Sequence, residues 1–389
     1  MAKAKSPSAK PASRAAKTAA LGPGSPLDSG AAITRPTSLA DIIGHQHAIG
    51  QLRSGIAADR LHHALIFFGP MGVGKFTAAL AFAAELLTPK STPDPDSIRA
   101  LLGKGGHADL HVITKELAAV SREDTVRRSK QVTIAKDVID EFLLEPADKS
   151  RAIASDSLAS KVFIVDEAEL LDRSLTNAPT QASMLKTLEE PPPGTIIILI
   201  TTDESRLLPT IRSRCQRIGF GRLSTEEVAA VLKAIGQHIA GAEGQWLLET
   251  CDGSPGAAIM AIKAGLFGWH QRLGPMLLAV EREPLSAPAL GHTMAGLVED
   301  RAAATVVEGG KGTSKEAANR HWTKVMLGYI AAHQRSRLMG DSSAYVKIDA
   351  ARIINLCLQA EEYLLNNVQH ATIFENLGAQ IASGEALLV

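Results

Sequence analysis

The chain has 389 residues, enough for two or three domains that each bury a hydrophobic core. Its 41 basic and 41 acidic residues balance, so no overall charge drives it onto nucleic acid or a membrane, and any such contact must be local. Cys215, Cys251 and Cys357 lie far apart in the sequence, which argues against a disulfide framework. No apolar stretch approaches the ~20 residues of a bilayer crossing, and no secretory signal is evident, so we expect a cytoplasmic protein without membrane contact.

The first 37 residues are predicted to be a disordered basic tail. Lys and Arg outnumber a single acidic residue, Asp28, and Ala, Ser, Gly and Pro separate them without a periodic apolar face. Such a tail could contact nucleic acid or a partner weakly, but a solvated extension is the simpler interpretation. Ordered structure is expected from Ser38.

Residues 38–220 alternate apolar runs with helical patterns. The runs 64–68, 162–165 and 195–200 are typical of buried strands, and 132–144 has helical periodicity. Strands that alternate with helices predict an α/β domain, a parallel sheet covered by helices on both faces.

After Phe220 the strand patterns stop and the chain is helical in character. The segment 224–227, Ser-Thr-Glu-Glu, is a typical helix start, because hydroxyls can cap the helix and carboxylates are favoured at the positive end of its dipole. A Gly- and Pro-rich break at 252–256 interrupts the pattern. We predict a small helical domain at 221–266 and a larger all-α domain at 267–389.

A Gly-Pro-Met-Gly-Val-Gly-Lys segment between a strand and a helix has the pattern of a phosphate-binding P-loop. Gly69, Gly72 and Gly74 would let backbone N–H groups point into a concavity at the helix N-terminus, where phosphate is favoured. Lys75 would supply a charge for the β- and γ-phosphates, and Thr77 could reach a neighbouring oxygen. The pattern predicts the P-loop fold and leaves nucleotide occupancy open.

Phe76 departs from this pattern. The residue after the P-loop lysine is normally Ser or Thr, whose hydroxyl holds Mg²⁺, and a phenyl ring cannot coordinate a metal. Asp166 and Glu167 follow an apolar strand, where in a working ATPase the first would hold Mg²⁺ and the second would orient water. They are candidates for a weak or vestigial nucleotide site, or only a charged strand end inherited from an active ancestor.

Arg214 is a candidate catalytic residue that would act in trans. A guanidinium delivered to a neighbouring subunit's γ-phosphate stabilises transition-state charge and can accelerate hydrolysis by ~10³ to 10⁵. From spacing alone, a surface arginine near Arg212 and Arg217 is the simpler interpretation.

Several segments resemble the AAA+ clamp-loader family of bacterial DNA polymerase III, in particular its delta-prime subunits. They are Ser213-Arg214-Cys215, the preceding Leu-Leu-Pro-Thr-Ile-Arg at 207–212, and Leu-Lys-Thr-Leu-Glu-Glu-Pro-Pro at 185–192. With weaker matches at 42–45 and 252–256, the resemblance covers roughly residues 38–266, and residues 360–377 resemble the family's collar domain less specifically.

The resemblance implies an AAA+ P-loop domain at 38–220, a helical lid at 221–266 and a collar at 267–389 that joins subunits into a five-subunit ring. That ring, which includes delta and gamma/tau-type subunits, opens a sliding clamp and places it on primed DNA as part of the DNA polymerase III holoenzyme. The delta-prime type is a mostly non-hydrolysing wall of the ring, and its Ser-Arg-Cys arginine serves the ATP site of an adjacent motor subunit. Arg214 would have that role.

At several positions this sequence differs from the family pattern, and the family properties that depend on those positions are not expected here. Phe76 removes the magnesium-binding hydroxyl, and Gly256 stands where ATP-hydrolysing subunits have a phosphate-sensing arginine. ATP or ADP could therefore be held without hydrolysis, and no independent ATPase activity is expected. The family's four-cysteine zinc module should lie at about 88–130, which contains no cysteine, so no metal site is expected.

Two alternatives stay open at this point. The chain could be an ATP-hydrolysing motor subunit of the same or a related AAA+ ring, with Thr77 or a water replacing the missing ligand. A P-loop kinase or transferase is disfavoured, because the segment 213–215 and the long helical C-terminus would have no role in it.

Overall fold

The computed structural model describes residues 36–103, 106–128, 132–153, 156–280, 283–309, 314–339, 344–366 and 368–383. The chain divides into two compact units. Unit 1 contains Met1–Gly69 and Lys75–Phe220, and unit 2 contains Pro70–Gly74 and Gly221–Val389. Residues 1–35, nearly all of the predicted basic tail, lie outside the described residues.

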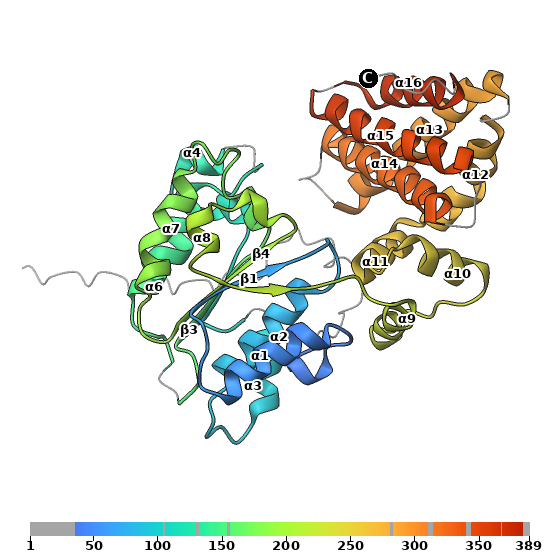
Figure 1. Cartoon of the computed structure of the whole chain (residues 1–389). Helices are drawn as coiled ribbons and strands as arrows, with labels where there is room; N and C mark the ends of the chain where they lie inside the picture. The colour runs from blue at the N-terminus through green and yellow to red at the C-terminus, as the bar shows by residue number, and fades with distance from the viewer. Residues whose placement is uncertain are drawn as a thin grey trace, which may run out of the picture. The chain divides into compact units, whose positions relative to one another are not determined.

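Unit 1 contains a five-stranded parallel sheet with the strand order β2-β3-β4-β1-β5 (Figure 1). The strands are β1 (Ala64–Phe68), β2 (Leu110–Ile113), β3 (Lys161–Val165), β4 (Thr195–Thr201) and β5 (Gln216–Gly219). The three central strands are the ones that the apolar runs predicted, since a strand buried on both faces has no polar alternation.

Helices cover both faces of this sheet (Figure 1). On one side lie α1 (Gln46–Ala57), α2 (Lys75–Leu87) and α3 (Pro95–Gly103), and on the other lie α4 (Asp124–Arg127), α5 (Lys136–Ile139), the π-helical turn η3 (Asp140–Leu144), α6 (Glu145–Asp148), α7 (Pro179–Glu189) and α8 (Pro209–Arg212). Short 3-10 turns are η1 (Leu39–Asp41), η2 (Lys115–Val120), η4 (Ala168–Leu170) and η5 (Glu204–Arg206).

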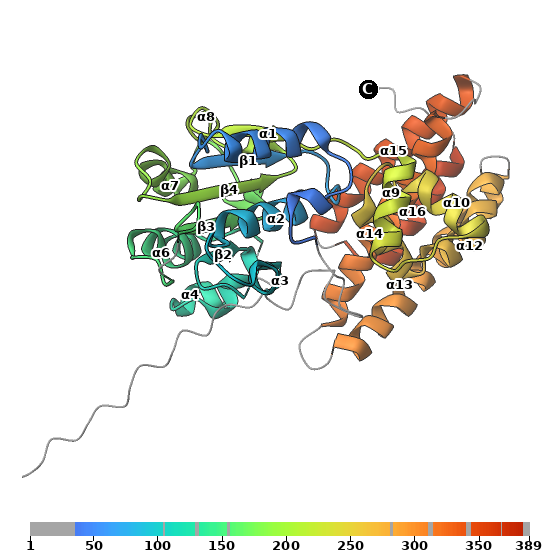
Figure 2. The same ribbon diagram turned by 90° about the horizontal axis from the view of Figure 1, so that it is seen from below.

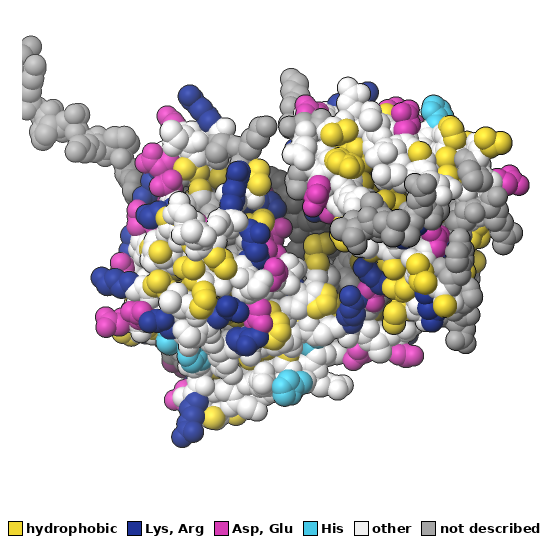
Figure 3. Space-filling view, turned by 45° about the horizontal axis from the view of Figure 1, so that its top comes forward, with side chains coloured by type: hydrophobic (Ala, Val, Ile, Leu, Met, Phe, Trp, Pro, Cys, Tyr) yellow, Lys and Arg dark blue, Asp and Glu magenta, His cyan; other side chains and the backbone are white. Residues whose placement is uncertain are grey.

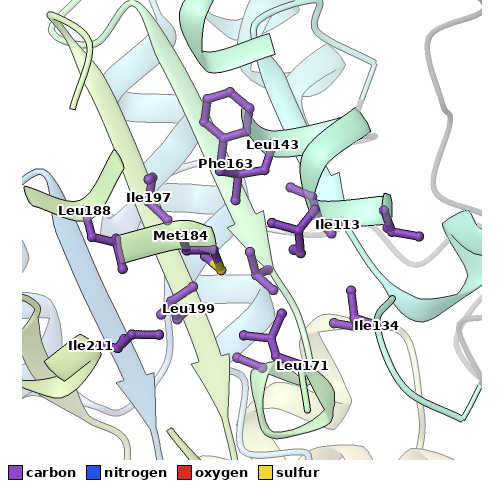
Figure 4. Packing of buried hydrophobic residues seen from close by; sticks show 14 of the residues in the cluster. Ile113, Ile134, Leu143, Phe163, Leu171, Met184, Leu188, Ile197, Leu199 and Ile211 are labelled. Carbon is purple, nitrogen blue, oxygen red and sulfur yellow. The ribbon is translucent and has the colours of Figure 1, made fainter. Parts of the chain in front are cut away.

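The core of unit 1 fixes α7 against the sheet. Met184 and Leu188 of α7 pack with Phe163 of β3 and with Ile197 and Leu199 of β4, all at most 1% exposed (Figure 4). Burying side chains of this size stabilises the fold by roughly 1.5–3 kcal/mol each. The C-terminal end of α7 is therefore held tightly against the sheet.

Among the described residues of unit 2, all regular secondary structure is helical. Its elements are α9 (Thr225–Ala234), α10 (Gly241–Thr250), α11 (Pro255–Ala264), α12 (Leu266–Val280), the 3-10 turn η6 (Pro284–Ser286), α13 (Ala287–Gly309), α14 (Lys315–Met339), α15 (Ala344–Leu365) and α16 (His370–Ser383). Helix α13 packs on α16 and α14 on α15, and Figure 2 shows these four helices gathered with α12. Ser224 and Glu227 form a capping box at the start of α9, where the sequence predicts a helix start.

The predicted fold class is confirmed in its architecture: an α/β domain with a parallel sheet covered by helices, followed by a helical region. Among the described residues, no helix is both long and apolar enough to cross a membrane. Basic and acidic side chains are interspersed on the face shown in Figure 3, as the balanced composition leads one to expect.

Candidate functional site

The P-loop turn begins where β1 ends, and its glycines are required by the backbone. Gly69 has a φ of +141°, and a Cβ atom there would lie 2.0 Å from the carbonyl oxygen of Phe220. Gly72 and Gly74 have φ values of +74° and +110°, which L side chains rarely adopt. The three glycines of the sequence pattern thus form the turn that a P-loop needs.

Lys75 is the first residue of α2 and is only 6% exposed. Its Nζ donates a hydrogen bond to the carbonyl oxygen of Gly69 over 2.7 Å. Burial lowers the pKa of Lys75 from its usual value, and the carboxylates of Glu169 and Asp166 act against that shift. The ammonium group is therefore held against the backbone of its own loop, with two carboxylates near enough to affect its pKa.

Phe76 and Thr77 occupy the next two positions of α2, and both are partly buried. The side chain of Phe76 has no oxygen, so the metal ligand of an ATPase P-loop is missing at this position. Successive helical residues are rotated by about 100°, so the hydroxyl of Thr77 points away from the direction of residue 76. The first turn of α2 does not fit a magnesium site.

Asp166 and Glu167 directly follow β3, as the sequence predicts. Burial raises the pKa of Asp166 to about 6, and the carboxylates of Glu167 and Glu169 contribute to that rise. Glu167 has a left-handed φ of +50°, and its backbone N–H donates to Oδ1 of Asp166 over 3.0 Å. Lys115 forms an ion pair with Glu167, with 2.6 Å between Nζ and Oε2. The carboxylate of Glu167 is thus already paired within the chain.

Glu169 is a member of this acidic group that sequence reasoning missed. It lies in η4, and its Oε1 accepts a 2.5 Å hydrogen bond from the hydroxyl of Thr202, which follows β4. The available signal was its position three residues after Asp166, in the turn that leaves the strand. Lys75, Asp166 and Glu169 lie close enough to affect one another's charge. No group of three metal-binding side chains was found in the described ranges.

Within unit 2, the P-loop residues contact the start of α11. The hydroxyl of Ser254 donates to the carbonyl oxygen of Met71 over 3.0 Å, and the N–H of Gly256 donates to the carbonyl oxygen of Gly72 over 2.9 Å. A Cβ atom on Gly256 would lie 2.7 Å from Cα of Gly72. The backbone of Gly72 therefore leaves no room for a side chain at position 256.

Arg214 follows α8 at the surface of unit 1 and is 37% exposed. Its Nη2 lies 2.7 Å from Oε1 of Glu189, and its Nη1 donates to the carbonyl oxygen of Thr210 over 3.0 Å. The neighbouring Cys215 is buried, and burial raises the pKa of its thiol to about 12, so it is not a nucleophile. Arg214 has these contacts with α7 and α8 and is not among the charges that shift the pKa of Lys75 or Asp166.

Comparison with known proteins finds similarity to subunits of DNA polymerase III. The model of the family described as "DNA polymerase III, delta subunit" matches residues 44–224. The DNA polymerase III subunit tau of Salmonella typhimurium is 33% identical over 213 residues, which are 53% of this chain and 29% of that protein. The DNA polymerase III subunit gamma of Buchnera aphidicola subsp. Acyrthosiphon pisum is 31% identical over 201 residues, 52% of this chain and 50% of that protein.

The matched region spans at most about half the length of these two relatives. Among solved structures, a DNA polymerase III gamma subunit-related protein from Thermotoga maritima has a TM-score of 0.42 and 16% identity, covering 86% of this chain and 99% of that one. Residues 44–224, which include the P-loop and Arg214, are thus similar to the DNA polymerase III delta subunit family and to the tau and gamma subunits.

Proposed function

We propose that this chain is a delta-prime-type subunit of a cytoplasmic DNA polymerase III clamp loader. It would hydrolyse little or no ATP itself and would supply Arg214 to the ATP site of a neighbouring subunit. Its partners would be delta and gamma/tau-type subunits in a five-subunit ring, and through that ring the sliding clamp and primed DNA. ATP or ADP could be held by the P-loop without turnover.

The observation that carries this proposal is the contrast between the two sites. Phe76 provides no ligand for Mg²⁺, and Glu167 is paired with Lys115, so the chain's own site lacks two parts of an ATPase. Arg214 is anchored by two contacts and still exposed, which is what a residue acting on another subunit needs.

The chemical role of Arg214 would be electrostatic. A planar guanidinium can donate two parallel hydrogen bonds to phosphate oxygens, where charge changes as the γ-phosphoryl group transfers. An interaction that strengthens only in the transition state raises the rate with little effect on nucleotide affinity.

The reconstituted loader carrying Arg214→Ala tests this role. Hydrolysis at the neighbouring site should slow by ~10³ or more, with a much smaller change in nucleotide affinity, and clamp loading should fall with it. Arg214→Lys should recover little, because a point charge lacks the planar fork. Arg217→Ala is the matched control, since Arg217 is also exposed but pairs with Glu204. Wild-type turnover and loading with Arg214→Ala would show that the arginine has no trans role.

A second candidate, an ATP-hydrolysing motor subunit, is favoured by the retained glycine geometry of the P-loop. Mg²⁺-dependent ATP hydrolysis by the isolated chain separates the two. We expect little or no turnover, because the first turn of α2 offers no magnesium ligand at Phe76. Turnover at ordinary AAA+ rates that Lys75→Ala abolishes would instead establish the motor function, whereas nucleotide binding alone would be compatible with the first proposal.

A further inference from the structure

The contact between Glu189 and Arg214 points to a second residue in the trans site. We propose that Glu189 is a positioning residue, which holds the Arg214 guanidinium in the orientation that serves the neighbouring subunit. The inference rests on the proposed function of Arg214 and adds to it the group that sets the arginine's geometry.

A carboxylate at the position of Glu189 is electrostatically unfavourable without a cation. Glu189 is the last residue of α7, where the helix dipole presents its negative end, and Glu190 adds a second negative charge beside it. The guanidinium of Arg214, 2.7 Å away, compensates that arrangement with a charge-assisted hydrogen bond. The negative charge at the end of α7 thus favours the pairing of Glu189 with Arg214.

The backbone that carries Glu189 is rigidly held. Leu188 is 1% exposed, and its carbonyl oxygen lies 2.8 Å from Nε2 of His63, the residue before β1. Surface ion pairs usually contribute little to stability, because ordering two long side chains costs conformational entropy. That entropy cost is smaller when the backbone of one partner, here Glu189, is already fixed. A guanidinium bound here therefore keeps one orientation more readily than it would against a loop.

The segment that leads to Arg214 is tied to the same helix at a second point. Gln181 of α7 is fully buried, and its Oε1 accepts a 2.7 Å hydrogen bond from the N–H of Leu208, just before α8. Its Nε2 donates to the carbonyl oxygen of Arg206 over 3.1 Å. The segment 206–214, which contains α8, is thus joined to both ends of α7, by Gln181 and by the Glu189–Arg214 pair.

The contacts of Arg214 leave part of its hydrogen-bonding capacity for a ligand. Arginine has five N–H groups, and the bonds to Glu189 and to the Thr210 carbonyl oxygen involve its two terminal nitrogens. Two anchors fix the plane of the guanidinium, while more than a third of the side chain stays exposed. This arrangement is preorganised, and a misplacement of 1 Å can cost about 10²-fold in rate. A carboxylate that merely sequestered the arginine would instead slow the neighbour's hydrolysis.

Steady-state ATP hydrolysis by the reconstituted loader, measured over a range of ATP concentrations, tests the role of Glu189. Glu189→Ala should lower kcat at the neighbouring site by about 10- to 100-fold with KM for ATP unchanged. Glu189→Gln keeps the hydrogen-bond acceptor and should recover part of the rate. Glu190→Ala removes the adjacent carboxylate and should turn over like wild type. In an Arg214→Ala background, Glu189→Ala should have no further effect, because its action passes through the arginine.

The possible results distinguish the role of Glu189 from the proposed trans role of Arg214. If Arg214→Ala is slow but Glu189→Ala keeps the wild-type rate or exceeds it, Glu189 does not position the arginine. If Glu189→Ala lowers kcat by the same factor in the presence and absence of Arg214, Glu189 has a general structural role and the inference is overturned. The inference is also overturned if the variant raises KM for ATP and leaves kcat unchanged. If the loader with Arg214→Ala hydrolyses ATP at the normal rate, the proposed trans role of Arg214 is wrong, and the role of Glu189 is wrong with it.

Discussion

Asp166 is a partly buried carboxyl group whose surroundings disfavour its charged form. Its pKa is raised to about 6, first by burial and then by the nearby carboxylates of Glu167 and Glu169. A magnesium ion would compensate this environment in an ATPase, but Phe76 removes one of the groups that would hold it. The carboxylate is therefore left in a place that disfavours its charge.

We predict that Asp166→Asn stabilises the protein at pH 7. The pKa of Asp166 is about 6 in the folded state against 3.8 for the ordinary group, so the free energy of unfolding is lowered progressively as pH rises from about 4 to 6. The variant should gain on the order of 2–3 kcal/mol at pH 7 and much less at pH 4. Denaturant unfolding of both proteins at the two pH values measures this. An equal difference at pH 4 and pH 7 would contradict it.

At the scale of elements, the contact between the P-loop and α11 depends on the absence of side chains. A Cβ on Gly256 would lie 2.7 Å from Cα of Gly72, and one on Gly72 would lie 2.5 Å from the Ser254 hydroxyl. Because the first obstacle is backbone, it cannot rotate away. Ser254 and Met71 are joined by a hydrogen bond although they are 183 residues apart in sequence.

Gly256→Ala should therefore destabilise unit 2 by about 1–3 kcal/mol, the usual cost of overpacking a close contact. Gly268→Ala is the control: this glycine lies in α12 with open space around its position, and alanine should be neutral or stabilising by up to about 1 kcal/mol. Thermal unfolding followed by tryptophan fluorescence compares them. Equal unfolding midpoints for the two variants would show that the contact is not tightly packed.

Strand β5 and helix α3 are elements that the sequence patterns did not predict. Strand β5 has four residues and a mostly exposed face, so no apolar run signals it. Helix α3 lies in a segment where Pro89, Pro93 and Pro95 suggest a loop, yet Pro95 occupies the first helical position, where proline is tolerated. Short elements of this kind depend on the surfaces that receive them.

At the scale of the whole molecule, aromatic and histidine rings join three helices of unit 2. Trp246 of α10 stacks on His270 of α12, with 5.2 Å between ring centroids. His270 lies near Tyr329 and His333 of α14. Burial lowers the pKa of His333 to about 4, and the charges of His270 and Arg337 contribute. This cluster is more stable with neutral imidazoles.

We therefore expect unit 2 to lose stability in mild acid. The pKa of His333 is about 4 in the folded state against 6.5 ordinarily, so its contribution is present above pH 6.5 and is lost as pH falls to about 4. The loss should be on the order of 3 kcal/mol, and His333→Phe should reduce it. All three tryptophans lie in unit 2, so their fluorescence follows its unfolding. An unchanged pH dependence in the variant would contradict this assignment.

His111 in unit 1 provides an internal comparison. Its pKa is also lowered to about 4, mainly by burial, but it stacks on Phe163 within the other unit. Substituting His111 should leave the tryptophan-detected acid transition of unit 2 in place, provided that the two units unfold separately. Since a protein with two compact units need not unfold in one step, each transition requires its own probe.

The sequence by itself determined the features that depend on local residue identity. Continuous apolar runs specify the buried strands, three glycines specify the P-loop turn, and Phe76 removes the metal ligand wherever the loop lies. These properties follow from side-chain chemistry and backbone freedom over a few residues, so they can be read without a structure. Arg214 was singled out only through the resemblance, and its role in trans stays a prediction.

Only the tertiary structure decided which charges and backbones meet. The pairing of Arg214 with Glu189, the place of Glu169 beside Lys75, and the contact of Gly256 with Gly72 each join separate elements. No periodicity encodes such contacts, because they depend on how helices pack on the sheet and on how much water that packing excludes. Burial then raises the pKa of Asp166 to about 6, a shift that residue type alone does not indicate.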